Sequence, residues 1–175
     1  RGRTWAGGEN EEGLYRDLIR EGYIPTDPAG ALKVGERATT LADALGRCKG
    51  AVNSWNSSVP LVRKYPLWGG AIRLIKAATG IEYTPRELED TLDRIYLQEM
   101  AFNVRQGMTR ADDRMPQRPE VGMTGRGRDD LARHQSLLDA YYTLHGCNPL
   151  TGIPERTELE RLGLHDVADV LHGSN

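Results

Sequence analysis

The sequence predicts an all-α, multihelical fold. Apolar residues recur at helical spacing in most long windows, and no window shows the sustained apolar and polar alternation of a half-buried strand. The chain has 175 residues, of which 38% are hydrophobic and 27% are charged, and this is enough for one domain with a modest core. We therefore expect residues 1–175 to form a single helical domain.

The first predicted helix runs from about Asn10 to Glu21, and Gly22 stands where a left-handed C-cap is needed. Turn-forming and polar residues follow in several segments, which we expect to be irregular. These segments are residues 25–30 as a turn-rich connection, residues 41–50 as a short mixed segment, and residues 53–58 as a polar loop.

The next helix is predicted over residues 67–79, with Gly80 at its end. Its apolar residues follow Leu67 at spacings of four, seven, eight and eleven, which places them on one face of a helix. We expect this helix to be substantially buried. The residues of the face are Leu67, Ala71, Leu74, Ile75 and Ala78.

The clearest helix start in the chain is the run from Thr84 to Glu87. Thr84 can accept a hydrogen bond from the amide of Glu87, the Glu87 carboxylate can reach back to the Thr84 amide, and Pro85 suits the first helical position. We expect the longest helix to begin within about two residues of Pro85 and to continue to about Arg105. Gly107 then marks the point where the chain exits the helix.

The C-terminal third is predicted as one long loop and three helices. Residues 108–127 contain Pro116, Pro119 and several glycines but no apolar periodicity, so they are expected to form the loop. The chain turns again at residues 147–150. The terminal helices are expected over residues 128–145, 154–162 and 165–171, with a break at Gly163 between the last two.

The charge balance excludes a general nucleic-acid binder. Lys and Arg total 23 against 25 Asp and Glu, so the net charge is 23 − 25 = −2, and the isoelectric point is about 6.1. Residues 110–130 are rich in arginine but carry no net charge, because five acidic residues balance the five arginines. The arginines are Arg110, Arg114, Arg118, Arg126 and Arg128, and the acids are Asp112, Asp113, Glu120, Asp129 and Asp130.

Membrane, secretory and zinc-binding classes are not indicated either. No apolar stretch approaches the roughly 18 residues of a membrane span, and the N-terminus has neither a signal core nor an initiator Met, which indicates a fragment or a processed piece. The two cysteines, Cys48 and Cys147, form no disulfide framework, so we expect a cytoplasmic location. The four histidines lack zinc-ligand spacing.

One short segment carries residue types suited to a cofactor. Asp43, Gly46 and Cys48 lie within six residues. A carboxylate can accept hydrogen bonds from the N–H groups of a pterin-like ring, glycine permits close backbone approach, and a thiolate can ligate iron. The alternative interpretation is structural, because a free cysteine is often a small buried hydrophobe.

The segment from Asp43 to Cys48 resembles the D-x-x-G-L-C motif in the C-terminal helical region of the aldehyde ferredoxin oxidoreductase family, with Arg47 where that family usually has Leu. Downstream, residues 103–110 resemble its N-x-R-E-G-F-T-R run and residues 112–118 its D-D-x-x-P-x-R run. Further matches follow in the same order up to residue 164. They are Tyr141-Tyr142, Gly146, Gly152-Ile153-Pro154 and Leu162-Gly163-Leu164.

The resemblance implies a tungsten or molybdenum centre held by two pterins, with Asp43 as a pterin acceptor, Gly46 and the Arg47 backbone at close-approach positions, and Cys48 as a ligand of a [4Fe-4S] cluster. It implies aldehyde oxidation, with electrons passed to ferredoxin. It assigns no catalytic residue in this chain.

Much of the family's machinery has no counterpart in residues 1–175, including its β-rich domain, its first pterin motif and its C-x-x-C-x-x-x-C cluster motif. We therefore expect the cofactor site to be completed by sequence outside residues 1–175 or by another subunit, and the piece alone to be inactive. The alternatives are a helical structural or interaction module without activity, and part of a ring-reducing acyl-CoA reductase subunit of the same family. For residues 103–118 we favour loop tethering over a substrate channel.

Overall fold

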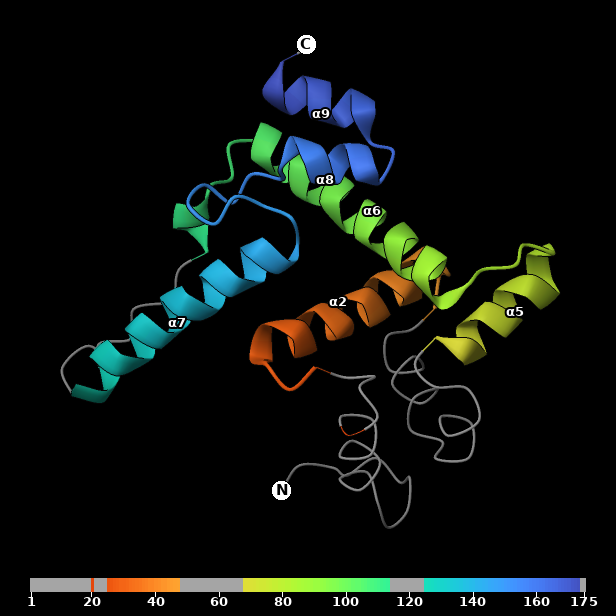
Figure 1. The fold of residues 1–175 in the computed structure, drawn as a ribbon, viewed down its shortest axis with the longest axis horizontal. Coiled ribbons are helices and arrows are strands. Elements are labelled where there is room, and N and C mark those ends of the chain that lie inside the picture. Colours follow the sequence, from red (N-terminus) through yellow and green to blue (C-terminus); the bar gives the residue numbers. More distant parts are fainter. Residues whose placement is uncertain (1–19, 21–24, 48–67, 114–124, 174–175) are drawn as a thin grey trace. The chain divides into compact units, whose positions relative to one another are not determined.

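The computed structural model describes residues 20, 25–47, 68–113 and 125–173, and the regular elements among them are all helical, which confirms the all-α prediction (Figure 1). The described residues contain no β-strand. The expected helix from Asn10 to Glu21, apart from residue 20, and the expected loop at residues 53–58 lie outside the described residues. The elements are α2 (Pro28–Ala44), α5 (Gly69–Thr79), α6 (Pro85–Arg105), the 3-10 helix η1 (Arg110–Asp112), α7 (Gly125–Leu144), α8 (Arg156–Arg161) and α9 (His165–His172).

Helix α2 corrects two sequence expectations. Residues 28–30, expected in a turn, and residues 41–44, expected in a mixed segment, belong to one continuous helix of 17 residues. Pro28 fits because a proline at the first helical position loses no intrahelical hydrogen bond. Val34, Ala38, Leu41 and Ala42 follow helical spacing, but Gly35, Thr39 and Thr40 between them are poor helix formers, so the local signal for this helix is weak. Burial of Leu41 and Ala42 stabilises the end of the helix.

Helix α6 begins with the predicted capping box. The Thr84 amide donates to Glu87 Oε2 at 2.7 Å, and the Glu87 amide donates to Thr84 Oγ1 at 3.2 Å. Helix α6 begins at Pro85 and, with 21 residues, is the longest helix among the described residues, as predicted.

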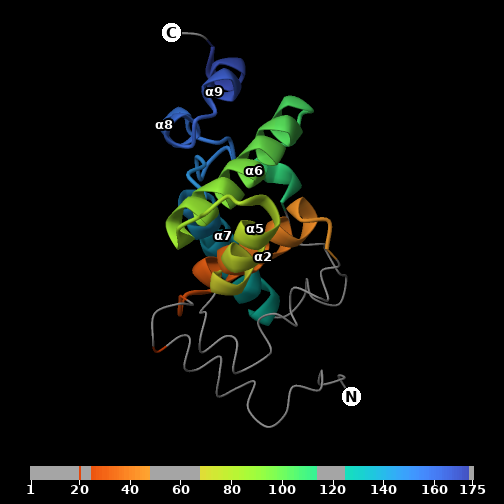
Figure 2. The same cartoon turned by 90° about the vertical axis from the view of Figure 1, so that its right-hand side faces the viewer.

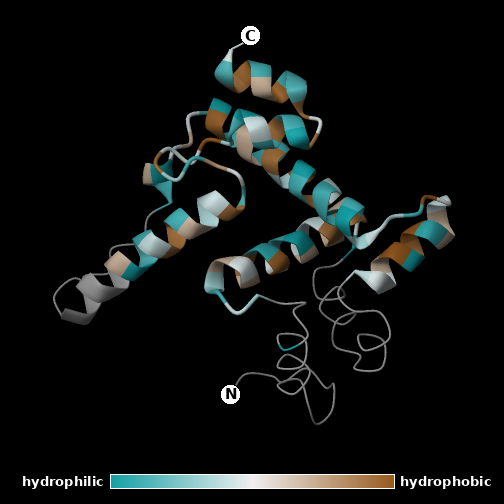
Figure 3. Cartoon of the chain, in the orientation of Figure 1, coloured by the Kyte–Doolittle hydropathy of each residue, from teal (hydrophilic) through white to brown (hydrophobic). Residues whose placement is uncertain are grey.

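Helix α5 has the expected end but not the expected burial. Gly80 is left-handed, with φ of 76°, and its amide donates to Lys76 O at 2.9 Å. Ala71 is buried, but Leu74 remains 49% exposed and Ala77 and Ala78 are exposed as well. Figure 3 shows hydrophobic residues along this helix. The expectation of substantial burial is wrong, because an apolar stripe does not specify what covers it.

The described residues fall into two compact units, and the boundaries lie inside α2 and α6. The first unit comprises residues 20, 25–27, 34–47 and 68–92. Its core joins the C-terminal part of α2, the start of α5 and the first half of α6. The buried residues of this core are Leu41, Trp68, Ala71, Leu88 and Leu92.

The second unit comprises residues 28–33, 93–113 and 125–173. Its core joins the second half of α6 with α7 and the two terminal helices, and α8 and α9 lie side by side in both views (Figures 1 and 2). The buried residues of this core are Leu97, Met100, Tyr142, Cys147, Leu159, Leu162, Leu164 and Ala168.

The C-terminal boundaries agree with the sequence predictions apart from the long loop. Helices α8 and α9 lie within two residues of their expected limits, and α7 ends one residue earlier than expected. The loop prediction over residues 108–127 is wrong at two places, because η1 forms at residues 110–112 and α7 already begins at Gly125. Among the described residues, no helix is both long and apolar enough to cross a membrane.

Candidate functional site

The predicted cofactor-contacting residues lie at the C-terminal end of α2. Asp43 is in the last turn of the helix, and Gly46 is left-handed with φ of 64°. The Gly46 amide donates to Asp43 O at 3.0 Å, and the Arg47 amide donates to Ala42 O at 2.8 Å. This pair of bonds is a Schellman motif, which explains the glycine by local backbone geometry. Cys48 lies outside the described residues.

This end of α2 is open to its surroundings. Asp43, Gly46 and Arg47 are all exposed. A Cβ atom added at Gly46 would find no heavy atom within 4 Å. A flat ring could therefore approach the backbone at Gly46 closely, as far as the described residues are concerned.

The charges at the helix end have different structural explanations. A helix C-terminus carries partial negative charge, so a cation such as Arg47 is favourable there and a carboxylate such as Asp43 is unfavourable. The backbone geometry of the helix end therefore explains Gly46, and the helix dipole favours the charge of Arg47. An exposed carboxylate in this place can accept hydrogen bonds from the N–H groups of a ligand ring.

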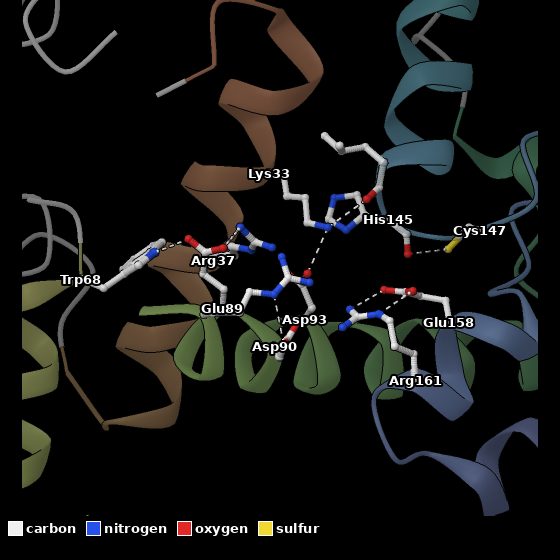
Figure 4. A network of polar contacts seen from close by, with 12 residues as sticks. Lys33, Arg37, Trp68, Glu89, Asp90, Asp93, His145, Cys147, Glu158 and Arg161 are labelled. Carbon is white, nitrogen blue, oxygen red and sulfur yellow. Dashed lines mark hydrogen bonds and ion pairs between the residues drawn. The ribbon is translucent and has the colours of Figure 1, made fainter. Parts of the chain in front are cut away.

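The open end rests on a well-packed base within the first unit. Leu41 is 3% exposed and Ala42 is completely buried. Glu89 on α6 pairs with Arg37 on α2 at 3.0 Å and accepts a hydrogen bond from Trp68 Nε1 at 2.8 Å (Figure 4). The backbone beneath the exposed residues is thus held by both apolar and polar contacts.

Sequence reasoning missed Glu89. Its partners lie 52 and 21 residues away along the chain, so no motif marks them. A weak signal does exist, because Glu89 directly follows Leu88 in the apolar stripe of α6. An acid next to a buried stripe is placed where it can meet partners from neighbouring helices.

The described residues do not complete a metal site. They contain no group of three or more His, Cys, Asp or Glu side chains that could hold a metal ion. A [4Fe-4S] cluster takes four cysteine ligands. The open surface and the carboxylate at the end of α2 fit one wall of a pterin site, whereas the described residues alone could not hold a [4Fe-4S] cluster.

The second motif region, around Arg110, forms tethers. Arg110 donates to Asp139 Oδ1 at 2.5 Å, to Gln135 Oε1 at 3.1 Å and to the carbonyl oxygen of Pro149. These contacts join the loop to α7 and to the turn before α8. They support the loop-tethering interpretation over a substrate channel. Arg118, the last residue of the second motif, lies outside the described residues.

The acidic residues of that region also make structural hydrogen bonds. The Asp112 side chain accepts from the Thr109 amide at 2.8 Å and caps η1. The Tyr142 hydroxyl donates a hydrogen bond to Asp113 Oδ2, and Tyr142 is 1% exposed. Burial, together with the hydrogen bond to Asp113, raises the pKa of Tyr142, so this hydroxyl stays protonated and continues to donate.

Cys147 is a core residue. It is 3% exposed and packs with Leu159, Leu162 and Leu164 of the terminal helices and their connection. Burial raises the pKa of the Cys147 thiol to about 12. A thiol held in its neutral form is a poor metal ligand and a poor nucleophile. Cys147 therefore acts as a small buried hydrophobe under the terminal helices.

Comparison with known proteins identifies the family. The family described as aldehyde ferredoxin oxidoreductase, domains 2 & 3, matches residues 13–164. The chain therefore belongs to the aldehyde ferredoxin oxidoreductase family, in the region of those domains, as its motifs predicted.

A solved relative agrees with this assignment. The active-site complex BamBC of benzoyl coenzyme A reductase, in complex with 1,5-dienoyl-CoA, contains a chain that is similar to this one with a TM-score of 0.59 and 28% sequence identity. The similarity covers 85% of this chain and 21% of that one. The present chain thus spans about a fifth of the length of that relative.

Proposed function

We propose that this chain is the C-terminal part of a tungsten or molybdenum pterin oxidoreductase, and that the open end of α2 completes its cofactor site. The observation that carries the proposal is the exposed, glycine-terminated helix end at Asp43, Gly46 and Arg47, which directly precedes Cys48 in a chain of this family.

Each residue of the segment has a separate role in this proposal. Asp43 accepts hydrogen bonds from pterin N–H groups, and Gly46 with the Arg47 backbone lets the ring approach the chain. Cys48 supplies one thiolate to a [4Fe-4S] cluster whose other three ligands lie outside this chain. The chemistry supplied by the bound groups is aldehyde oxidation with single-electron transfer to ferredoxin.

Two alternatives have specific observations behind them. The similarity to the benzoyl coenzyme A reductase complex supports a ring-reducing acyl-CoA reductase subunit of the same family. Arg47 in the place of the family's Leu supports a helical module that kept the fold without activity of its own. Assays of the complete enzyme with an aldehyde and with an aromatic acyl-CoA separate the three functions.

The wider setting follows from the same proposal. In this proposal the chain works with the remaining domains or another subunit and with a ferredoxin, without nucleic acid or membrane. A cytoplasmic enzyme is consistent with two cysteines that form no disulfide framework.

The test compares the two cysteines in the complete, natively purified enzyme. We expect Cys48→Ser to lower the iron and sulfide content, because serine is a poor replacement for a cluster thiolate. Cys147→Ser should keep full metal content but lose about 1–3 kcal/mol of stability, because its hydroxyl is poorly satisfied in an apolar core. Full cluster occupancy in Cys48→Ser, with losses in Cys147→Ser, contradicts the proposal.

A further inference from the structure

Helix α5 has a broad apolar side of which the first unit covers only one part. The covered part consists of Ala71, which is buried, and of Ile72 and Ile75, which pack against the core of that unit. The open part consists of Leu74, Ala77 and Ala78, which are all exposed. Figure 3 shows the hydrophobic residues along this helix.

The three open residues share one side of the helix and are called the α5 stripe below. Ala77 and Ala78 follow Leu74 by three and four residues, so their side chains are neighbours on the helix surface. Leu74 is 49% exposed. A single exposed apolar residue is ordinary, but the α5 stripe continues a side of the helix that is already packed.

The shape of the α5 stripe suits another helix. Helices pack by inserting the side-chain ridges of one into the grooves of the other, and small side chains allow the two axes to come close. Leu74 supplies a ridge, and Ala77 and Ala78 leave a shallow groove beside it. An apolar ridge on a second helix fits that groove.

The charges of α5 indicate the chemistry of that second helix. Arg73 and Lys76 are the charged residues of α5, and the helix contains no acid. Lys76 pairs with Glu82, just beyond the helix, at 2.6 Å. The surroundings of the α5 stripe are therefore basic overall, which favours a partner with acidic residues beside its apolar ridge.

The same charges disfavour a second copy of this chain as the partner. In a symmetric dimer each surface patch meets itself, so two α5 helices would bring their basic residues together. Like charges that face each other across an interface cost binding free energy. A different surface has to supply the acids.

The family comparison provides a source for that surface. The similarity to the benzoyl coenzyme A reductase complex covers 85% of this chain but only 21% of the related chain. Most of the related chain therefore lies outside the match. An enzyme of that length has ample surface with which to cover the α5 stripe.

We propose that the α5 stripe binds an amphipathic helix, apolar on one side with acidic residues next to it, from the part of the enzyme outside residues 1–175. The proposal rests on the proposed function in one respect, namely that this chain works with remaining domains or another subunit. It involves none of the residues assigned to the cofactor.

The first experiment identifies what lies against the α5 stripe in the complete, natively purified enzyme. Leu74→p-benzoylphenylalanine places a photoreactive group in the stripe, and mass spectrometry identifies the peptide to which it crosslinks. Ala140→p-benzoylphenylalanine, at an exposed position of α7 in the second unit, is the control.

We expect position 74 to crosslink to an acidic, helical peptide outside residues 1–175, and position 140 not to reach that peptide. A crosslink from position 74 into residues 1–175 assigns the stripe to this chain or to a second copy and overturns the proposal. The absence of any crosslink, or the same peptide from both positions, overturns it as well.

The second experiment measures the cover of Leu74 by hydroxyl-radical labelling of the complete enzyme. Leu74 should be labelled as little as Leu159, which is completely buried. Ala78→Asp puts a carboxylate into the stripe and should increase the labelling of Leu74. The matched exchange Ala140→Asp should leave it at the wild-type level.

Strong labelling of Leu74 in the wild-type enzyme, or equal labelling in Ala78→Asp and wild type, contradicts the proposed helix contact. Neither experiment reads the cofactor. Failure here is therefore distinct from failure of the proposed function, which is read from the cluster content of Cys48→Ser.

Discussion

Two helix ends in this chain share a backbone design but differ in their surroundings. Helix α2 ends at Gly46 with φ of 64°, and α7 ends at Gly146 with φ of 66°. In each, the glycine amide donates to the carbonyl three residues earlier and the next amide donates to the carbonyl five residues before it. Each glycine is followed within two residues by a cysteine.

The end of α7 is closed by its neighbours. A Cβ atom at Gly146 would lie 2.7 Å from Glu158 Cβ, and the Gly146 carbonyl accepts from the Glu155 amide at 2.9 Å. The buried Lys33 ammonium donates to Leu144 O at 2.9 Å and pairs with Asp93 at 3.0 Å (Figure 4). A cation at a helix C-terminus is favourable, so this contact further stabilises the end.

Among the residues that the structure describes, the end of α2 lacks comparable cover, since none of their heavy atoms would lie within 4 Å of a Cβ at Gly46. The comparison teaches that one local motif can serve two purposes. Where the chain folds back over it, the helix end is part of the core, and where it stays open it can face a ligand.

The largest expected difference is between alanine substitutions at the two glycines. Gly146→Ala should cost about 3 kcal/mol, because left-handed strain adds to a collision with the Glu158 side chain. Gly46→Ala should cost only about 1 kcal/mol, because strain acts there without a collision. Urea denaturation of the two variants measures both costs.

The comparison depends on the difference between these two values. Equal losses of stability would mean that the ends are equally covered, contrary to the contacts seen at Gly146. A separate measurement of cofactor content in Gly46→Ala shows whether added volume at the open end also interferes with the ring proposed to approach it.

The pH dependence of stability tests how closed the α7 end is. Burial, and secondarily the Glu155 carboxylate, raises the pKa of the Cys147 thiol from its ordinary value of 9.0 to about 12. Above pH 9 the Cys147 thiol loses its proton in the unfolded protein but keeps it in the folded protein. Stability should therefore fall with rising pH in this window, by about 1.4 kcal/mol per pH unit.

Cys147→Ala should flatten that slope, because it removes the titrating group while leaving other alkaline titrations in place. The readout is the denaturation midpoint of wild type and variant between pH 8 and 10. Identical slopes in the two proteins would show that the Cys147 thiol is reached by solvent in the folded state.

The smallest effect is expected at the N-terminal cap of α6. Thr84→Ala removes the acceptor for the Glu87 amide and should cost about 1 kcal/mol. Thermal melting of the variant provides the measurement, and an unchanged midpoint would contradict the cap. The effect should be the same with and without cofactor, since Thr84 touches neither helix end compared above.

Local signals in the sequence were reliable where their physical cause is local. The capping box at Thr84 and Glu87, the stop at Gly80 and the break at Gly163 depend on backbone and side-chain groups within a few residues of one another. The cofactor roles of Asp43, Gly46, Arg47 and Cys48 stay predictions.

Long-range contacts produced the differences. The continuity of α2 was not predicted because Gly35, Thr39 and Thr40 weaken the local helix signal, and the packing of Leu41 and Ala42 stabilises its end. The exposure of Leu74 could not be predicted from the sequence either, because periodicity shows which residues share a helix face but not whether another element packs against that face.

The amino-acid order alone indicated the helix stop at Gly146, because glycine adopts the left-handed conformation needed there without a Cβ penalty. The stop at Gly46 has the same local cause, but the helix that it ends was found only in the structure. Tertiary structure decides that one stop is covered and the other open, because the covering atoms belong to Glu158, twelve residues beyond Gly146. It also decides that Glu89 joins Arg37 to Trp68. Contacts between distant residues depend on how helices pack, which no short pattern encodes.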